Sequence, residues 1–195
     1  MSKTNCKEIG KQLGVFLKKL HGVKNINSNF CSLEMEIKAW QSRVKDVESF
    51  INKTFSSEEQ KILNKLIFEY MPHKLKSLGE NLVYSHGDLG DGNIFIDDNY
   101  HVGVIDFNES GLLDEAADFM DISDNMIVNE MLISYGANNS LKEKVNLRRD
   151  IRPIIVLKPY LTRNNPDVID NLVKLIRKSL TKYKILLNET IAYKE

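Results

Sequence analysis

One short stretch interrupts a sequence that otherwise has the apolar spacing of helices. Three β-type runs occur there: Leu82–Tyr84, Ile94–Ile96 and Tyr100–Phe107. A polar, glycine-rich loop of residues 85–93 separates the first two runs, and turn residues at 97–99 separate the last two. Short β-type runs joined by such turn residues predict a hairpin. The stretch therefore predicts an α+β chain, mainly helical, with one small β-hairpin.

The sequence on both sides of this stretch has helical periodicity. Apolar residues recur three or four positions apart in the ranges 9–20, 33–51 and 62–70. Ser56 and Glu59 have the capping-box spacing, which predicts a helix that begins there. The pattern is again typical of helices from Glu115 onward, and a final helix is expected from Asp167 to about Tyr193. The expected parts are a helical part (1–80), a loop and hairpin (81–108) and a second helical part (109–195).

Composition excludes several classes of protein. Lysine plus arginine and aspartate plus glutamate both number 27 in 195 residues, so no bulk positive charge favours nucleic acid. Cys6 and Cys31 are far apart and do not suggest a disulfide framework. The start lacks the apolar segment of a signal peptide, and no apolar run is long enough to cross a membrane. We expect a cytoplasmic protein of one domain that binds neither nucleic acid nor membrane.

The loop and the last β-type run carry oxygen-bearing side chains that can meet. Asp88 and Asn93 are five residues apart in a loop whose glycines let it fold back on itself. A tight hairpin returns Asp106 to the vicinity of Asn93. Carboxylate and amide oxygens are the ligands that Mg²⁺ prefers, and such a site suits phosphoryl transfer. We predict Asp88 as the base that accepts the proton of an attacking hydroxyl, and Asn93 and Asp106 as metal ligands.

The same loop resembles a known catalytic motif. His86-Gly87-Asp88-Leu89, with Asn93 four residues after Leu89, resembles the H-R-D-L-x-x-x-N loop of protein kinases, with glycine in place of arginine. Glycine at that position is characteristic of the aminoglycoside phosphotransferase and choline kinase group, the small-molecule branch of that superfamily. The resemblance implies a kinase-like C-terminal lobe with its hairpin at the active edge.

Three further segments extend the resemblance to about residues 5–125. Val104–Phe107 is similar to the group's counterpart of the D-F-G element, which implies Asp106 as the magnesium ligand. Asp114–Phe119 is similar to its D-P-A-x-D stretch, with Glu115 where proline is usual. The segment from Ile9 to Gly22 resembles the first C-lobe helix of the group. We interpret His86 and Asp118 as supports of the loop rather than as catalysts.

The resemblance implies an ATP- and Mg²⁺-dependent phosphotransferase that acts on a hydroxyl of a small molecule, most similar to an aminoglycoside. A cationic acceptor would be attracted by carboxylates. An acidic run that follows the metal aspartate includes Asp114, Glu115, Asp121 and Asp124. These residues either form a solvated helix face or face the acceptor in the second helical part.

The chain departs from the kinase pattern before residue 80. No G-x-G-x-x-G loop and no strand lysine precede the first helix, so we expect that the N-terminal β lobe is absent and the nucleotide site incomplete. We then expect weak ATP binding by this chain alone, unless a partner chain supplies the lobe. An inactive or truncated kinase-like module with a binding or regulatory role is the alternative. A metal-dependent phosphoesterase is a third, less favoured class, because it would need additional metal ligands.

Overall fold

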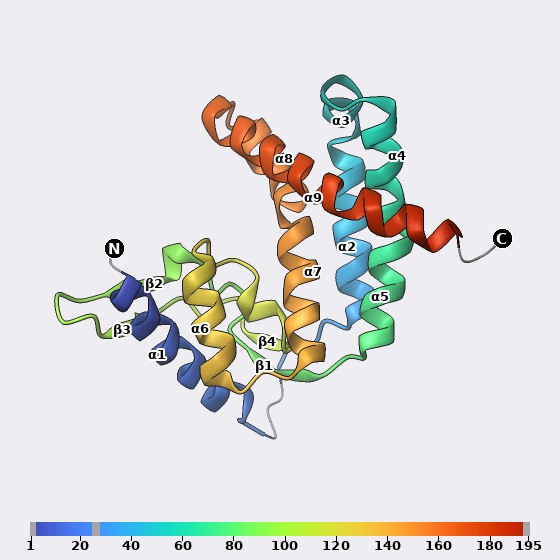
Figure 1. The fold of residues 1–195 in the computed structure, drawn as a ribbon. Coiled ribbons are helices and arrows are strands. Elements are labelled where there is room, and N and C mark those ends of the chain that lie inside the picture. Colours follow the sequence, from blue (N-terminus) through green and yellow to red (C-terminus); the bar gives the residue numbers. More distant parts are fainter. Residues whose placement is uncertain (1–2, 25–27, 193–195) are drawn as a thin grey trace. The chain divides into compact units, whose positions relative to one another are not determined.

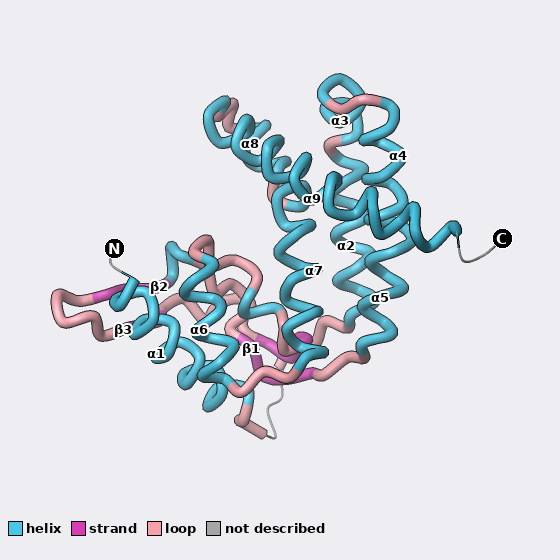
Figure 2. Tube along the Cα trace, viewed as in Figure 1, coloured by secondary structure: helices cyan, strands magenta, loops and turns pink. Residues whose placement is uncertain are grey.

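A computed structural model describes residues 3–24 and 28–192 (Figure 1). The helices are α1 (Lys3–His21), α2 (Leu33–Asp46), α3 (Glu48–Thr54), α4 (Ser57–Lys65), α5 (Met71–Leu78), α6 (Asn125–Tyr135), α7 (Asn139–Ile155), α8 (Leu157–Thr162) and α9 (Pro166–Ala192). The strands are β1 (Leu82–Ser85), β2 (Ile94–Ile96), β3 (Val102–Val104) and β4 (Gly111–Asp114). Helix dominates, with small antiparallel sheets between the helices, so the predicted mainly helical α+β fold is confirmed (Figure 2). None of the described helices is long and apolar enough to cross a membrane.

The chain divides into two compact units, each built from two separate segments. The first unit comprises Met1–Leu33 and Leu78–Arg148, and the second comprises Glu34–Ser77 and Arg149–Glu195. Both sheets and the predicted catalytic loop lie in the first unit. The second unit is helical in the part that the structure describes.

Helices α1 and α6 of the first unit pack with their backbones unusually close. A Cβ atom on Gly10 would lie 2.5 Å from the carbonyl oxygen of Ile127, and one on Gly14 would lie 2.4 Å from that of Met131. Gly10 and Gly14 are one helical turn apart, so they present one smooth face to α6. This contact positions α1 and α6 for the loop that lies beside them.

The core of the first unit lies directly under the predicted catalytic loop. Leu89, in the middle of that loop, is 2% exposed and belongs to the same buried cluster as side chains of α1 and α6. Other members of the cluster are Ile9, Leu13, Leu17, Phe119, Ile122 and Met131. Burying a leucine side chain contributes about 2 kcal/mol. Leu89 therefore anchors the loop from below, while the polar residues on either side of it remain at the surface.

The two sheets are both antiparallel pairs. Strands β2 and β3 form the predicted hairpin, with Ile94 opposite Val104. The third β-type run is shorter than predicted, because Tyr100 and Asp106 both have left-handed backbones, with φ of 63° at each. Strand β4 was not predicted, and it pairs with β1 from Leu82↔Asp114 to Ser85↔Gly111.

The second unit confirms the helix start that was read from the capping-box spacing. The backbone N–H of Glu59 donates to Oγ of Ser56, and the backbone N–H of Ser56 donates to the Glu59 carboxylate. Helix α9 is tied to α4 by an ion pair of 3.0 Å between Arg177 and Glu59. The predicted end of the last helix, Tyr193, lies outside the described residues.

We predict that Gly14→Ala destabilises the protein. The added methyl group would collide with the backbone of α6, and overpacking of this kind costs about 3 kcal/mol, more than the gain of about 1 kcal/mol in helix propensity. The urea midpoint should fall by the equivalent of about 2 kcal/mol. Gly92→Ala is the control, because nothing lies within 4 Å of its Cβ position. Equal midpoints for Gly14→Ala and the wild type would show that the close helix contact is not required.

Candidate functional site

The predicted catalytic loop connects β1 to β2 and folds back at a glycine. Gly87 has a left-handed backbone with φ of 86°, which residues with a side chain rarely adopt. A Cβ atom on Gly87 would also lie 2.1 Å from the carbonyl oxygen of Glu109. The loop therefore touches the turn before β4 through the backbone of Gly87, and glycine is required there for two independent reasons.

Asp88 and Asn93 meet, as the sequence predicted for the two ends of this loop. The side-chain Nδ2 of Asn93 donates to the carbonyl oxygen of Asp88 at 2.8 Å and to Oδ2 of Asp88 at 3.0 Å. The Asp88 side chain is exposed. The Asn93 amide nitrogen donates both of these hydrogen bonds to Asp88, so the Asn93 Oδ1 atom points away from Asp88. No described residue donates to it.

Asp106 lies at the facing end of the hairpin. The backbone N–H of Ile105 donates to the carbonyl oxygen of Asn93 at 3.1 Å, so Asp106 follows the residue bonded to Asn93. The left-handed backbone at Asp106 turns the chain away from β3 at this point. Nδ2 of Asn108 donates to Oδ1 of Asp106 at 2.6 Å and restricts the carboxylate. The hairpin thus brings Asn93 and Asp106 to the same end of two paired strands.

His86 is fully buried beneath the loop and bonds it to the hairpin. Its Nε2 donates to the carbonyl oxygen of Ile105 at 2.8 Å, and its Nδ1 accepts from the backbone N–H of Asp88 at 3.3 Å. The ring also packs on Phe107, with ring centroids 4.5 Å apart. His86 therefore connects the backbones on both sides of the site, and its ring is enclosed rather than open to solvent.

Asp118 is the buried acceptor that holds the loop backbone. Its Oδ2 accepts from the N–H of His86 at 2.9 Å, and its Oδ1 accepts from the N–H of Gly87 at 2.9 Å. Its carboxylate is 0% exposed and also pairs with Nε2 of His21 at 3.0 Å. Hydrogen bonds to a charged acceptor are roughly twice as strong as neutral ones. Asp118 therefore fixes the two peptide groups immediately before Asp88.

Two residues that the sequence analysis did not assign to the site complete this network. Nδ1 of His21, at the end of α1, lies 3.0 Å from the hydroxyl of Tyr135, at the end of α6. Burial, followed by the nearby carboxylates of Glu115, Asp118 and Asp114, raises the pKa of Tyr135 to about 12. Tyr135 therefore keeps its proton, and its hydroxyl group can donate a hydrogen bond to Nδ1 of His21. The Nε2–H group of His21 is then directed to Asp118. His21 lies 97 residues from Asp118 and 114 from Tyr135, so no local pattern pairs them.

Half of the predicted acidic run is neutralised inside the first unit. The Asp114 carboxylate is buried and pairs with Lys144 at 2.8 Å and with Arg148 at 3.0 Å. Burial by itself would raise the pKa of Asp114, but Arg148, Lys144 and the backbone N–H of Asn81 outweigh it, and the pKa is lowered. Glu115 pairs with the same Lys144 at 3.1 Å. Neither carboxylate is available to a cationic acceptor in this arrangement.

The other half of the run lies beside the catalytic loop. Asp124 caps α6, because its Oδ1 accepts from the N–H of Met126 at 2.7 Å and from that of Ile127 at 3.3 Å. Asp121 is half-buried next to Gly90 of the loop, where a Cβ on Gly90 would lie 3.5 Å from Cβ of Asp121. The N–H of Ser123 donates to Asp91 at 3.2 Å. Segment 121–124 thus braces the loop, through the bond from Ser123 to Asp91 and through Asp121 beside Gly90.

The donor set at the end of the hairpin fits a hard divalent cation. Asn93 Oδ1 and the Asp106 carboxylate are both oxygen ligands, and Mg²⁺ typically takes one or two protein oxygens and completes its shell with water and phosphate oxygens. In residues 3–24 and 28–192, no three histidine, cysteine or acidic side chains cluster as a metal site.

Comparison with known proteins gives one consistent group. A model described as the phosphotransferase enzyme family matches residues 1–139. An aminoglycoside 3'-phosphotransferase of Enterococcus faecalis is 56% identical over 36 residues, which are 18% of this chain and 14% of that protein.

Solved structures agree in fold at low sequence identity. The GDP complex of wild-type aminoglycoside 2'-phosphotransferase-IIIa matches with a TM-score of 0.67 at 16% identity, over 93% of this chain and 64% of that one. The choline kinase LicA from Streptococcus pneumoniae matches with a TM-score of 0.63 at 17% identity, over 94% and 67%. The chain therefore spans less than two thirds of the length of the aminoglycoside phosphotransferases named here.

We predict that Asp114→Asn destabilises the protein in a pH-dependent way. Removing one partner of a buried charge cluster costs about 3 kcal/mol at pH 7. The pKa of Asp114 is lowered by folding, so its contribution is complete above the unfolded value of about 3.9 and is lost as pH falls through the folded value.

Urea unfolding of both proteins from pH 7 to pH 3 measures this difference. The gap in stability between the wild type and Asp114→Asn should be constant down to about pH 5 and shrink below about pH 4. Asp170→Asn, at an exposed position on α9, is the control and should show no such gap. A gap that stays constant to pH 3 would contradict the assignment.

Proposed function

The chain belongs to the phosphotransferase enzyme family, and from this premise we propose that it transfers the terminal phosphoryl group of ATP to a hydroxyl group of a small molecule. The single observation that carries the proposal is the contact between Asn93 and the exposed Asp88 carboxylate, on a loop whose backbone is held by buried Asp118. Phosphoryl transfer asks a protein mainly to position its reactants, and a loop that is fixed from below while its carboxylate faces solvent suits that task.

Asp88 acts as the base in this proposal. As the acceptor oxygen forms its bond to the terminal phosphorus and the bond from that phosphorus to ADP breaks, the hydroxyl proton passes to the Asp88 carboxylate. Asn93 orients that carboxylate by donating to Oδ2 at 3.0 Å. Asp118 and His86 take no part in proton transfer, because both are buried and their polar atoms are already engaged with the backbone.

Asn93 Oδ1 and the Asp106 carboxylate hold the metal ion in this proposal. Bound Mg²⁺ would neutralise charge on the phosphate oxygens and fix their orientation. Asp106 is restricted by Asn108, and Asn93 is restricted by Asp88, so both ligands are oriented before the ion arrives. Such preorganisation reduces the entropy lost on binding.

The nucleotide lies against the hairpin in this proposal. Phe95 and Ile105, which lie between the two proposed metal ligands in sequence, are 60% and 46% exposed. Apolar side chains of this kind suit the face of a purine base. The hairpin by itself offers a nucleotide few contacts, so we expect it to contribute only part of the affinity for ATP.

A cationic hydroxylated molecule, similar to an aminoglycoside, is the proposed acceptor. One related structure is described as a complex of an aminoglycoside 2''-phosphotransferase with GDP and kanamycin. Of the four predicted acidic residues, Asp121 is the one that we retain for the acceptor, because it lies beside Gly90 of the catalytic loop. Related choline kinases make an amino alcohol the second choice.

The alternative remains a kinase-like module that binds or regulates without catalysis. An enzyme would need the Asp88 carboxylate for phosphoryl transfer, whereas a binding or regulatory module would not.

We predict that Asp88→Asn lowers phosphoryl transfer by at least about 10²-fold, because it removes the base and keeps the shape of the side chain. The assay measures ADP release from ATP and Mg²⁺ with kanamycin or choline as acceptor. It uses the chain alone and the chain co-expressed with the N-terminal lobe of a related kinase. Asp98→Asn, an exposed carboxylate in the hairpin turn, is the matched control and should retain wild-type activity.

Two results would overturn the enzyme assignment. One is the absence of acceptor-dependent ADP release in both preparations of the wild type. The other is turnover that persists unchanged in Asp88→Asn. Weak turnover by the chain alone that rises with the added lobe, and that Asp88→Asn removes, would support the proposal in full.

A further inference from the structure

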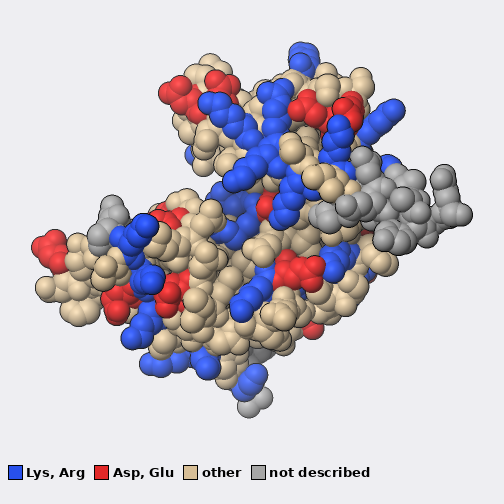
Figure 3. Space-filling view, viewed as in Figure 1, with Lys and Arg blue, Asp and Glu red and all other residues tan. Residues whose placement is uncertain are grey.

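Equal numbers of acidic and basic residues conceal a separation of charge along the chain. The segment 78–148 of the first unit is strongly acidic, with Lys142, Lys144 and Arg148 as its basic residues. The segment 149–184 of the second unit is basic. Its cations are Arg149, Arg152, Lys158, Arg163, Lys174, Arg177, Lys178, Lys182 and Lys184, and its acidic residues are Asp150, Asp167 and Asp170. In Figure 3, lysine and arginine side chains gather in the region where Figure 1 labels α8 and α9.

A cavity of about 520 Å³ opens in the second unit at this basic surface. It lies between the last turn of α2 and the junction of α7 with α8, and its lining residues are Arg43, Asp46, Ile155, Val156, Lys158, Pro159, Tyr160 and Arg163. The junction is formed where Val156, with φ of −90° and ψ of 0°, separates the two helices. Buried Ile155 gives the cavity an apolar floor, and half-buried Tyr160 adds a hydroxyl group. The size and the mixed lining suit a small molecule.

The charges of this cavity do not balance. Asp46 is its carboxylate, and Oδ2 of Asp46 is bonded to Nζ of Lys158 at 2.8 Å. Arg43, on the last turn of α2, and Arg163, at the end of α8, have no ion-pair or hydrogen-bond partner for their guanidinium groups among the side chains described for residues 3–24 and 28–185. Arginine stays charged at every physiological pH. The cavity therefore keeps two uncompensated positive charges.

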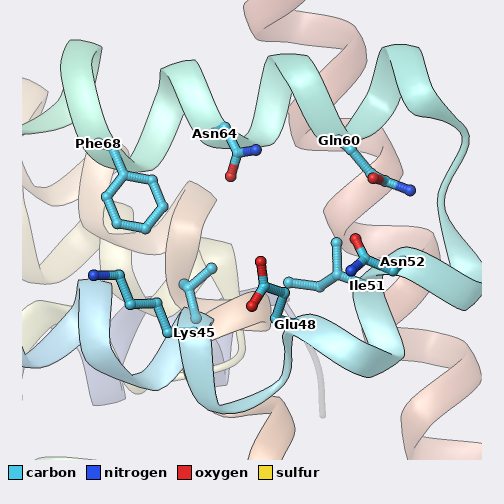
Figure 4. Close-up of a pocket in the computed structure, with 8 residues that line it drawn as sticks. Lys45, Glu48, Ile51, Asn52, Gln60, Asn64 and Phe68 are labelled. Atoms are coloured by element: carbon cyan, nitrogen blue, oxygen red, sulfur yellow. The ribbon is translucent and has the colours of Figure 1, made fainter.

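A second hollow in the same unit shows that this excess is not a general property of the surface. It lies between α2–α3 and α4 with the following π-helical turn (Leu66–Tyr70), and Figure 4 shows its side chains pointing toward one another. There Lys45 and Glu48 supply opposite charges, and Asn52, Gln60 and Asn64 are neutral. A hollow with balanced charge has no reason to select an anion.

We propose that the cavity lined by Arg43, Tyr160 and Arg163 binds the phosphate group of a small phosphorylated molecule. Guanidinium groups match the geometry of phosphate oxygens and are less strongly hydrated than lysine, so they bind such anions well. Tyr160 can donate a further hydrogen bond, and the Ile155 floor can accommodate an organic portion. The size of the cavity favours a small molecule, because a polymer such as nucleic acid would require an extended basic stripe. The inference does not depend on the proposed phosphoryl transfer.

Calorimetric titration of the full chain with inorganic phosphate and with glucose 6-phosphate tests the proposal, at low salt because screening weakens exposed charge interactions. We expect saturable binding of one equivalent, which Arg43→Gln and Arg163→Gln each weaken about tenfold, equivalent to about 1.4 kcal/mol. Arg163→Lys keeps the charge and should recover part of the affinity. Lys61→Gln, at an exposed position on α4 outside both hollows, is the control and should bind as the wild type does. Thermal unfolding confirms that each variant is folded.

Comparing the affinities for inorganic phosphate and glucose 6-phosphate shows which part of the ligand the cavity recognises. Equal affinities would mean that the cavity recognises phosphate alone, and tighter binding of glucose 6-phosphate would mean that it also contacts the organic portion; both support the proposal. Three results would overturn it. These are no saturable binding at millimolar concentrations, equal weakening by Lys61→Gln and Arg163→Gln, and binding of duplex DNA in preference to either small phosphate compound.

Discussion

The buried carboxylate of Asp118 is the interaction on which the candidate site depends. It accepts the two peptide N–H groups that precede Asp88, and it pairs with His21, which in turn contacts Tyr135. A carboxylate removed from water is costly unless its oxygens are fully engaged, and here they are. The result is a fixed loop backbone that depends on α1 and α6 being close together, which Gly10 and Gly14 allow.

Acidic residues have two different tasks in the first unit. Asp114, Asp118 and Asp124 are used within the fold, where they bind cations, loop peptides and a helix terminus. Asp88 and Asp106 are exposed, and each is restrained by an amide side chain. A sequence shows only that both groups are acidic. Burial and partners separate the two groups, and of the four carboxylates in the predicted acidic run the proposal keeps Asp121 for its position beside Gly90.

Local patterns in the sequence predicted much of this arrangement, but they did not predict the contacts between residues far apart in the chain. The capping box at Ser56, the hairpin and the contact of Asp88 with Asn93 all depend on residues close in sequence. Strand β4 was missed because its four residues are strand-like only when β1 lies beside them. The roles of His21 and Tyr135 were missed because their partners are about a hundred residues away, and the resemblance to kinases named the loop without its supports.

The central claim is that Asn93 and Asp106 hold one divalent ion beside Asp88. Mn²⁺, a paramagnetic substitute for Mg²⁺, broadens the NMR signals of nearby nuclei, so titrating it into the ¹⁵N-labelled chain with a non-hydrolysable ATP analogue locates the ion. The account predicts that the amide signals of Asn93 and Asp106 broaden first, while those of the hairpin turn at residues 97–101 persist. Broadening centred on that turn, or on segment 114–124, with residues 93 and 106 unaffected, would contradict it.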